Sequence, residues 1–393
     1  MISVTQAIQI VQKNVQPRHD SIKKGVSNAL GYILFDDVTS PMHMPPFRQS
    51  AMDGYALCLH DALNYQVVGE VKAGDNNQPE LLSGEAVRIF TGAPVPSSAN
   101  AVIMQEKVML EGNAITLETI PPLNDNIRSL GEQIEKGQIA LTKGTTLNSA
   151  GIGFLSSLGI TEIAVYEKPS VAIVVTGNEL AEPGQPLLHG QIYESNAIML
   201  TGALGNLGYQ NMTTYRVDDN YQNTLELLQK TISEHDIILV SGGISVGDYD
   251  FVGKALLELK VDPLFYKVKQ KPGKPLFFGK KDSKVIFALP GNPAASLSCF
   301  YIYVHLALQR LSGDTQFSTA KTQAKSQSNF QKKGDRAQFL KANYHNGHVE
   351  ILDGQSSAML HTFALANALV YLPETTYTIN KGDTVEVILL PFK

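Results

Sequence analysis

The stretch "KPSVAIVVTGNEL", from Lys168 to Leu180, decides the fold class of this chain. It starts with polar residues, continues as an unbroken apolar run and ends in a glycine turn that is followed by an acid. A continuous apolar run is typical of a strand that is buried on both faces of a parallel sheet. We therefore predict that this strand belongs to an open α/β domain.

The segments after Leu180 alternate between strand-like and helix-like patterns. Strands with their following loops are predicted in 213–220, 236–250 and 285–293, and helices in 193–208, 221–235, 251–259 and 294–311. Strands that alternate with helices indicate βαβ units around an open sheet. Short β-rich runs occupy about 65–120, and similar runs follow a polar connector that begins near Gln316. Both flanking parts are therefore predicted to be all-β modules.

The bulk composition excludes several classes of protein. The chain has 393 residues, enough for two to four domains, and a net charge of −5 that gives no global basic field for nucleic acid or an anionic membrane. Cys58 and Cys299 form no CxxC pair, so neither a disulfide scaffold nor a zinc cluster is indicated. The N-terminus has the pattern of an amphipathic helix, and no apolar run approaches a membrane span. We expect a cytoplasmic protein without nucleic-acid or membrane partners.

Polar and glycine-rich sequences follow each predicted strand of the α/β domain. They are "TGNEL" (176–180), "VDDN" (217–220), "SGGISVGDYD" (241–250) and "PGNPAAS" (290–296). Because ligands bind beyond the carboxyl ends of the strands in open α/β sheets, we expect these loops to form one site. Glycine N–H groups in the third loop approach phosphate closely, and Glu179, Asp219 and Asp250 offer the oxygen ligands that Mg²⁺ prefers. These residues predict a site for phosphate and Mg²⁺.

The third loop can be compared with two known motifs. The loop lacks GxxxxGK[ST], so it is not a Walker A motif. Residues 243–247, "GISVG", match the G-x-S-x-G elbow of α/β hydrolases, which would make Ser245 a nucleophile. That motif requires a sharp turn from strand to serine, whereas Ser241, Gly242 and Gly243 intervene between the apolar run and Ser245. We therefore rank a hydrolase behind the phosphate site.

Two further stretches have both a structural and a functional interpretation. Lysines 267, 269, 271 and 274 surround the turn "KPGKP" (271–275), which is either a solvated basic loop or, as we favour, an oxyanion clamp. The stretch "PPFRQSAMDGYAL" (45–57) places Arg48, Ser50 and Asp53 on one short loop. From the residues alone, Asp-Gly favours a turn with positive φ over an active-site segment.

An ordered set of motifs resembles the molybdopterin molybdenumtransferases, the MoeA family, which also forms the C-terminal part of gephyrin. The motifs are "FRQSAMDGYA", "IFTGAPVP", "VVTGNEL", "GQIYESN", "SGGISVGDYD", "KPGKP" and "LPGNPAAS". This resemblance implies insertion of molybdate into the dithiolene of adenylylated molybdopterin, with Mg²⁺ as cofactor and with release of AMP and molybdenum cofactor. It also implies a homodimer whose active site lies between the α/β domain of one subunit and the smaller β domain of the other.

The resemblance implies a multidomain α/β plus β fold. Its parts are a central open α/β domain that is MogA-like and binds molybdopterin, β-rich domains before it, and a C-terminal β-barrel-like domain. The expected boundaries are 21–39 with 138–163 for a small linker and dimer domain, 40–137 for a β-rich domain, 1–20 with 164–318 for the α/β domain, and 319–393 for the C-terminal domain.

Site residues follow from the resemblance position by position. Catalytic roles are implied for Asp53, Thr91, Glu179, Asp219 and Asp250, of which Glu179, Asp219 and Asp250 are the metal ligands. The pterin-nucleotide pocket is implied for Ser241, Gly242, Gly243, Ser245, Gly247, Pro290, Gly291, Asn292 and Pro293. Molybdate binding is implied for Lys271, Lys274, Arg336 and Ser357. By the same resemblance, Asp53 is presented across the dimer interface.

The chain departs from the family pattern at three positions. Gln133 replaces an acid, Asn178 stands where Asp is usual, and Ala368 stands where Gly is usual. These departures keep a low-activity accessory paralogue open as an alternative. The resemblance leaves two more, which are a molybdopterin adenylyltransferase, whose α/β domain is shared, and a scaffold module as in gephyrin. The resemblance also allows molybdopterin adenylyltransferase and molybdoenzyme maturation proteins as partners.

Overall fold

The computed structural model describes residues 1–243 and 251–391 and divides into two compact units. The larger unit comprises Met1–Ile22, Gly31–Phe35 and Val165–Lys393, and the smaller unit comprises Lys23–Leu30 and Asp36–Ala164. None of the helices in the described ranges combines the length and the apolar character needed to span a membrane.

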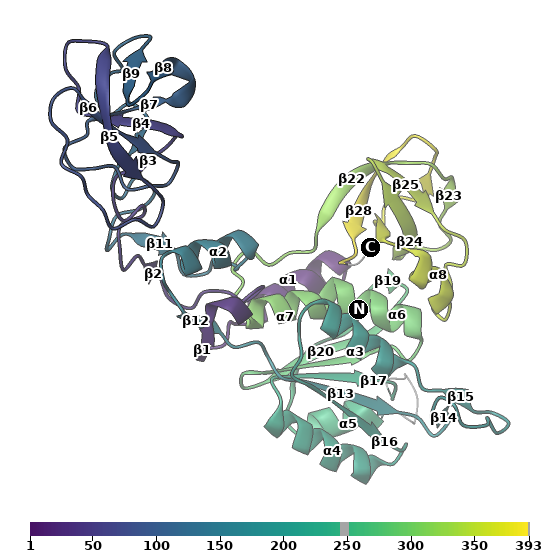
Figure 1. Ribbon diagram of the computed structural model, residues 1–393. Coiled ribbons are helices and arrows are strands. Elements are labelled where there is room, and N and C mark those ends of the chain that lie inside the picture. The colour runs from purple at the N-terminus through teal and green to yellow at the C-terminus, as the bar shows by residue number, and fades with distance from the viewer. Residues whose placement is uncertain (244–250, 392–393) are drawn as a thin grey trace. The chain divides into compact units, whose positions relative to one another are not determined.

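A six-stranded sheet forms the centre of the larger unit (Figure 1). Its order is β16-β13-β17-β21-β20-β18, and the first four strands run parallel. The strands are Met212–Val217 (β16), Val171–Thr176 (β13), Ile237–Ser241 (β17), Lys284–Leu289 (β21), Pro275–Lys281 (β20) and Asp262–Lys267 (β18). The predicted open α/β fold is confirmed. The antiparallel pairing of β20 with β21 and β18 is a feature that the sequence analysis did not predict.

Helices cover both faces of this sheet (Figure 1). They are Val4–Asn14 (α1), Asn196–Asn206 (α3), Tyr221–Glu234 (α4), Phe251–Glu258 (α5), Pro293–Cys299 (α6), the π-helical turn Phe300–Val304 (η3) and His305–Leu311 (α7). Alternate residues of β13 pack in two cores: Val171 and Ile173 with α1, α3 and α7, and Ala172 and Val174 with α4 and α5. Burial on both faces explains why this strand is a continuous apolar run.

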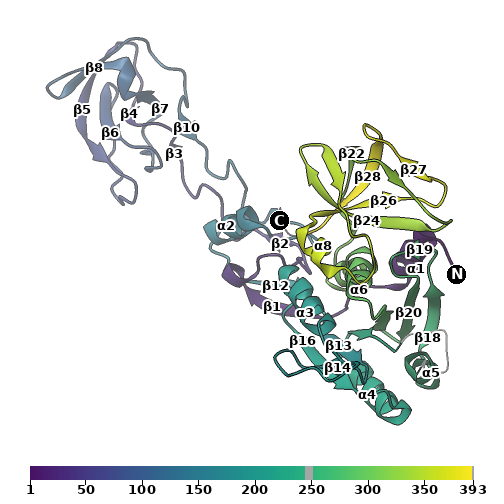
Figure 2. The same ribbon diagram turned by 90° about the vertical axis from the view of Figure 1, so that its right-hand side faces the viewer.

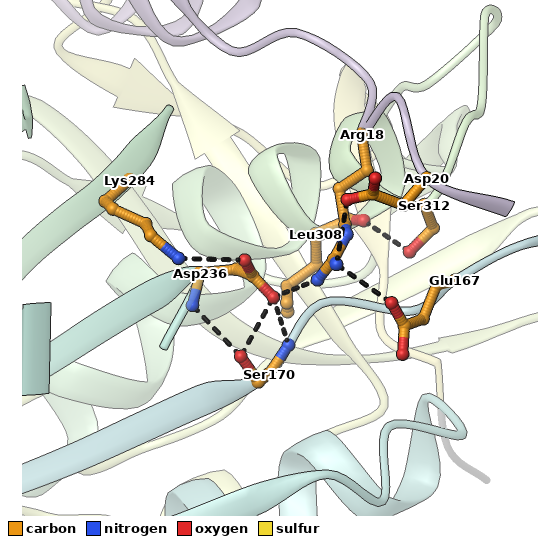
Figure 3. Close-up of polar contacts among 8 residues, drawn as sticks. All are labelled: Arg18, Asp20, Glu167, Ser170, Asp236, Lys284, Leu308 and Ser312. Carbon is orange, nitrogen blue, oxygen red and sulfur yellow. Dashed lines mark hydrogen bonds and ion pairs between the residues drawn. The ribbon is translucent and has the colours of Figure 1, made fainter. Parts of the chain in front are cut away.

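A network of charged side chains fastens the amino ends of the parallel strands (Figure 3). Asp236 directly precedes β17, and its carboxylate accepts hydrogen bonds from the backbone N–H and the hydroxyl of Ser170 at 2.9 and 2.8 Å. Arg18 and Lys284 donate to the same carboxylate. Burial raises the pKa of Asp236, but the bonds from Ser170 and the charges of Arg18 and Lys284 outweigh it and hold this pKa below its usual range.

The C-terminal part of the larger unit is a closed five-stranded barrel (Figure 2). Its strands are Lys321–Ser326 (β22), Ala337–His345 (β24), His348–Ile351 (β25), Ala368–Leu372 (β26) and Thr384–Leu389 (β28). Pairing of β24 with β26 closes the ring, which confirms the predicted barrel-like domain. The short strand Gln270–Lys271 (β19), which comes from the α/β part of the chain, pairs parallel with β24. The departure Ala368 is fully buried in β26.

The smaller unit contains a second six-stranded sheet, in the order β7-β4-β6-β5-β9-β8. Its strands are Ala101–Met104 (β7), Gly54–Leu57 (β4), Glu85–Ile89 (β6), Asn64–Val71 (β5), Ala114–Leu117 (β9) and Val108–Glu111 (β8). Five of these strands match the short β-rich runs at about 65–120, and β4 lies before them, in a stretch that the sequence analysis interpreted as a loop. The remaining named elements of the smaller unit include Val38–Thr39 (β2), Gln49–Ser50 (β3), Ile127–Arg128 (β10), Ile139–Leu141 (β11) and Ser149–Ser157 (α2). The boundaries expected for a separate linker domain stay a prediction.

Candidate functional site

A cleft of about 460 Å³ lies at the carboxyl ends of β13, β17 and β21. The predicted site residues that line it are Glu179, Ser241, Gly242, Pro290, Gly291, Asn292 and Pro293. The first and last of these residues are more than a hundred positions apart in the sequence. The parallel pairing of the strands brings their loops to the same edge of the sheet. The loops after β13, β17 and β21 therefore lie together at one edge of the sheet, and their role as a binding site stays a prediction. Ser245, Gly247 and Asp250 lie outside the described residues.

The glycines after β17 are required by the backbone and by close contacts. Gly242 has a φ of +95°, and a Cβ on it would lie 2.5 Å from the carbonyl oxygen of Thr176. Gly243 has a φ of +63°, and its Cβ would lie 2.6 Å from a methyl group of Val252. A side chain at either position would be strained and would also collide with its neighbours. The loop therefore runs tightly against the end of β13.

Asp219 is oriented by residues of the neighbouring loop. The Thr176 hydroxyl donates to Asp219 Oδ1 at 2.7 Å, and the backbone N–H of Asn178 lies 3.4 Å from Asp219 Oδ2. In return, the backbone N–H of Asp219 donates to Asn178 Oδ1 at 3.0 Å. An amide oxygen accepts this bond as a carboxylate would, so the departure at Asn178 preserves the contact and removes a negative charge.

Glu179 and Asp219 provide some of the oxygen ligands that a divalent cation needs. Glu179 lines the cleft, and its carboxylate has no hydrogen-bond or ion-pair partner in the described part of the chain. The oxygens of Asp219 retain acceptor capacity beyond their two donors. Within residues 1–243 and 251–391, no three His, Cys, Asp or Glu side chains form a group that could hold a metal. Mg²⁺ that also binds substrate phosphates needs only one or two carboxylates. Glu179 is among the residues that line the cleft, whereas Asp219 is not.

Asn196 is a cleft residue that the sequence analysis did not single out. Its side-chain N–H₂ group donates to Ser241 Oγ and to the carbonyl oxygen of Gly291, both at 2.8 Å. It therefore ties together the loops after β17 and β21. Glu194 is buried and accepts from the backbone N–H of Ala197, which fixes the start of α3. In the sequence, the four polar residues "YESN" (193–196) directly before an apolar helix could have indicated these two residues.

The basic turn, residues 271–275, lies beside the cleft, because Pro275 is one of the cleft-lining residues. The backbone N–H of Val268 donates to the Lys274 carbonyl oxygen at 3.0 Å and closes the turn. Arg336 Nη1 donates to the carbonyl oxygen of Gln270 at 3.3 Å. Lys271 and Lys274 are exposed, and neither has an ion-pair partner among the described residues. Three of the predicted molybdate ligands therefore gather around one turn.

Ser357, the fourth predicted molybdate ligand, touches a cleft loop. Asn292 Nδ2 donates to its hydroxyl at 3.0 Å, and the backbone N–H of Ala295 donates to its carbonyl oxygen at 3.2 Å. The loop that carries Ser357 is held from inside the barrel by Lys341, which is 4% exposed. Its ammonium group donates to the carbonyl oxygens of residues 354, 356 and 359, and burial lowers its pKa.

Asp53 and Thr91 form a pair in the smaller unit. The backbone N–H and the hydroxyl of Thr91 donate to Asp53 Oδ1 at 2.7 and 2.8 Å, and these bonds lower the pKa of Asp53. The interpretation of Asp-Gly as a turn with positive φ is wrong, because Gly54 begins the extended strand β4. A Cβ on Gly54 would lie 1.8 Å from the carbonyl oxygen of Ile103, so close strand packing requires the glycine.

Three family models match consecutive parts of the chain. The MoeA N-terminal region (domain I and II) matches residues 2–159, and the probable molybdopterin binding domain matches residues 172–310. The MoeA C-terminal region (domain IV) matches residues 323–390.

Full-length relatives and solved structures agree with these matches. The chain is 36% identical to a molybdopterin molybdenumtransferase from Haemophilus influenzae over 92% of each chain. It is 32% identical to the Staphylococcus epidermidis protein of that name, over 99% of this chain and 95% of that one. The crystal structure of a molybdopterin biosynthesis moeA protein from Pyrococcus horikoshii OT3 has a TM-score of 0.85 at 30% identity and covers 99% of this chain and 100% of its own. The chain therefore belongs to the MoeA family of molybdopterin molybdenumtransferases.

Proposed function

We propose that this chain inserts molybdenum, supplied as molybdate, into adenylylated molybdopterin with Mg²⁺ as cofactor, and that it releases AMP and molybdenum cofactor. Family membership makes the chain an enzyme of the molybdenumtransferase type. The observation that carries the finer proposal is the position of the basic turn next to the cleft, through Pro275. A phosphate-binding cleft and an oxyanion-binding turn side by side suit a reaction that joins these two substrates.

The cleft is proposed to hold the pterin nucleotide. Gly242 presents backbone without a side chain, and Pro290 and Pro293 stiffen the loop on the other side. Asn196 holds both loops at a fixed separation through its two hydrogen bonds. Ser245 and Gly247 belong to the same proposed pocket by their sequence positions alone.

Glu179 and Asp219 would hold Mg²⁺, with Asp250 as the third ligand that the family resemblance implies. When bound, the ion would offset negative charge on the substrate phosphates. Thr176 and Asn178 orient Asp219 for this role through the bonds described above. Glu179 keeps both carboxylate oxygens available.

The cations of the basic turn, with Arg336 and Ser357, are proposed to bind molybdate, a dianion. Lysines act as point charges toward such an oxyanion, and arginine adds directed N–H groups. They would hold molybdate beside the dithiolene and stabilise charge as the bond between AMP and the pterin phosphate breaks. Asp53, from the second subunit of a proposed homodimer, or Asp250 would orient the attacking oxygen.

An assay of the purified enzyme with adenylylated molybdopterin, Mg²⁺ and molybdate tests the proposal. We expect AMP release that depends on molybdate and parallels formation of molybdenum cofactor. Replacing the adenylylated pterin with molybdopterin and ATP tests the alternative of an adenylyltransferase, which would form the adenylylated product. Tight binding of the adenylylated pterin with no AMP release under any condition would contradict the proposal and support an accessory or scaffold role.

A further inference from the structure

The basic turn is held from inside the protein by Gln270, whose exposure is 0%. Gln270 Nε2 donates to the carbonyl oxygen of Gly273 at 3.0 Å and to Cys299 Sγ at 3.5 Å. Gln270 Oε1 accepts a hydrogen bond from the hydroxyl of Tyr303. Both ends of the buried amide are therefore engaged, and one of its bonds fastens the turn itself.

Close packing leaves this turn little freedom. Gly273 has a φ of +81°, and a Cβ on it would lie 2.5 Å from Cys299 Sγ and 3.7 Å from the carbonyl oxygen of Ala295. Ala295 and Cys299 lie on α6, and Tyr303 lies in the π-helical turn that continues it. Turns of this kind inside helices occur frequently at functional sites. The helix that begins at the cleft therefore also holds the basic turn.

The backbone of Gln270 fixes the third cation. Its carbonyl oxygen accepts from Arg336 Nη1 at 3.3 Å, and β19 places Gln270 opposite Ala337 of the barrel. One buried residue thus contacts the turn with its side chain and Arg336 with its main chain.

The neighbouring Lys269 shows how carboxylate partners would change a lysine in this region. Lys269 is paired with Asp335 at 3.0 Å and with Glu374 at 3.6 Å, so its charge is already offset. Gln270 and Tyr303 are uncharged groups that hold the turn at Gly273, between Lys271 and Lys274, without offering a carboxylate to compete with a bound dianion. This arrangement leaves the two lysine charges available for a ligand.

We propose that Gln270, held by Tyr303, is a positioning residue that sets the affinity of the enzyme for molybdate by fixing Lys271, Lys274 and Arg336 relative to one another. The inference rests on the proposed function, in which these cations bind molybdate. The three cations repel one another, so bringing them together around a small anion costs free energy. That cost is smaller when Gln270 and Tyr303, which we call the frame, already hold the cations in place before molybdate binds.

Two variants of this frame test the inference. Tyr303→Phe removes only the hydroxyl that Gln270 Oε1 accepts from. The double variant Gln270→Met with Tyr303→Phe replaces both side chains with apolar groups of similar size. It leaves no unpaired side-chain amide oxygen, and the Gly273 carbonyl oxygen loses its donor from Gln270. The matched control is Tyr209→Phe, which removes a buried hydroxyl that bonds Ser312 Oγ at 3.1 Å, away from the turn.

We expect the KM for molybdate to rise about 5- to 10-fold in both frame variants, the size expected for one or two lost hydrogen bonds. The kcat and the KM for adenylylated molybdopterin should change less than about twofold, and Tyr209→Phe should leave all three parameters unchanged. A general loss of structure would instead move every parameter. A molybdate KM at the wild-type value in either folded frame variant overturns the inference.

Calorimetric binding of molybdate to the full-length enzyme separates this inference from the proposed function. If the wild type releases no AMP but binds molybdate, and the frame variants bind it more weakly, the proposed function fails and the positioning role stands. If the wild type inserts molybdenum and the frame variants keep its molybdate KM and Kd, the positioning role fails and the function stands.

Discussion

The parallel sheet has carboxylates at both ends, and the two ends use them in opposite ways. At the amino end, Asp236 accepts from Ser170 twice and from Arg18 and Lys284, so its oxygens are saturated (Figure 3). At the carboxyl end, Asp219 has one hydrogen bond of 2.7 Å and one longer contact of 3.4 Å. The carboxylate of Glu179, on the loop after β13, has no hydrogen-bond or ion-pair partner in the described ranges.

The number of hydrogen-bond partners of each carboxylate distinguishes structural residues from candidate site residues. A partly buried carboxylate that meets all of its hydrogen-bonding capacity inside the protein stabilises the fold and has nothing left for a ligand. A carboxylate with spare capacity beside a cleft contributes little to stability but is available to a cation or a reacting group. Substitutions at the two ends should therefore affect different properties.

The largest expected effect is on activity, from Asp219→Asn at the carboxyl end. Loss of this charge should lower the rate of AMP release about a hundredfold or more, because charge stabilisation near the phosphates is worth roughly 3 kcal/mol. The free energy of unfolding should stay within about 0.5 kcal/mol of the wild type, as for other exposed positions. Steady-state kinetics and urea denaturation measure the two quantities. A large loss of stability with normal kinetics would reverse the assignment of this end as the site.

The next effect is on stability, from Asp236→Asn at the amino end. The change removes the charge that Arg18 and Lys284 face, and it turns an amide N–H₂ toward their donors. We expect a loss of about 2–4 kcal/mol in the free energy of unfolding, since one partner of a mostly buried ion network is lost. The kcat of the folded enzyme should not change.

Asp20→Asn is the matched control for this network. Asp20 contacts Arg18 at 3.3 Å, but its side chain is 72% exposed, so its loss should have an effect too small to resolve by urea denaturation. Equal destabilisation by Asp20→Asn and Asp236→Asn would show that saturation of the Asp236 carboxylate is not what matters.

Lowering the pH should reduce the difference in unfolding free energy between the wild type and Asp236→Asn. The folded structure holds the pKa of Asp236 below its ordinary value, so the carboxylate contributes stability at pH values above its unfolded pKa of about 3.9. That contribution is lost as the pH falls through the lowered pKa of the folded state. The gap in unfolding free energy should be constant from about pH 7 to pH 5 and should shrink below about pH 4. A gap that grows on acidification would contradict this sign.

The sequence predicted the parallel strands and the loops at their carboxyl ends, but it did not predict the antiparallel strands beside them. The strands at 171–176 and 237–241 are apolar runs that are buried on both faces, and a parallel register then determines which loops meet. Strands β18 and β20 were missed, because lysines and prolines interrupt the stretch between them. Such residues resemble loop signals even where the chain pairs at a sheet edge.

The missed positioning residues act through contacts across long stretches of sequence. Asn196 bonds residues that lie 45 and 95 positions away, and no local pattern encodes such a meeting. Gln270 stands in a lysine-rich segment that predicts a solvated loop, yet it is fully buried. A single polar residue gives no periodic signal, so its burial emerges only once the tertiary structure surrounds it.

The smallest expected effect tests the departure at Asn178 and sharpens the contrast between the two ends. Asn178→Asp keeps the acceptor for the backbone N–H of Asp219 and adds a negative charge beside two carboxylates that have spare capacity. We expect the Mg²⁺ concentration for half-maximal AMP release to fall about two- to fivefold, the size of an exposed charge interaction. Asn178→Ala removes the acceptor without adding charge and should raise that concentration instead. If both variants behave like the wild type, the loop after β13 does not tune cation binding, and the spare capacity of Glu179 and Asp219 serves something other than Mg²⁺.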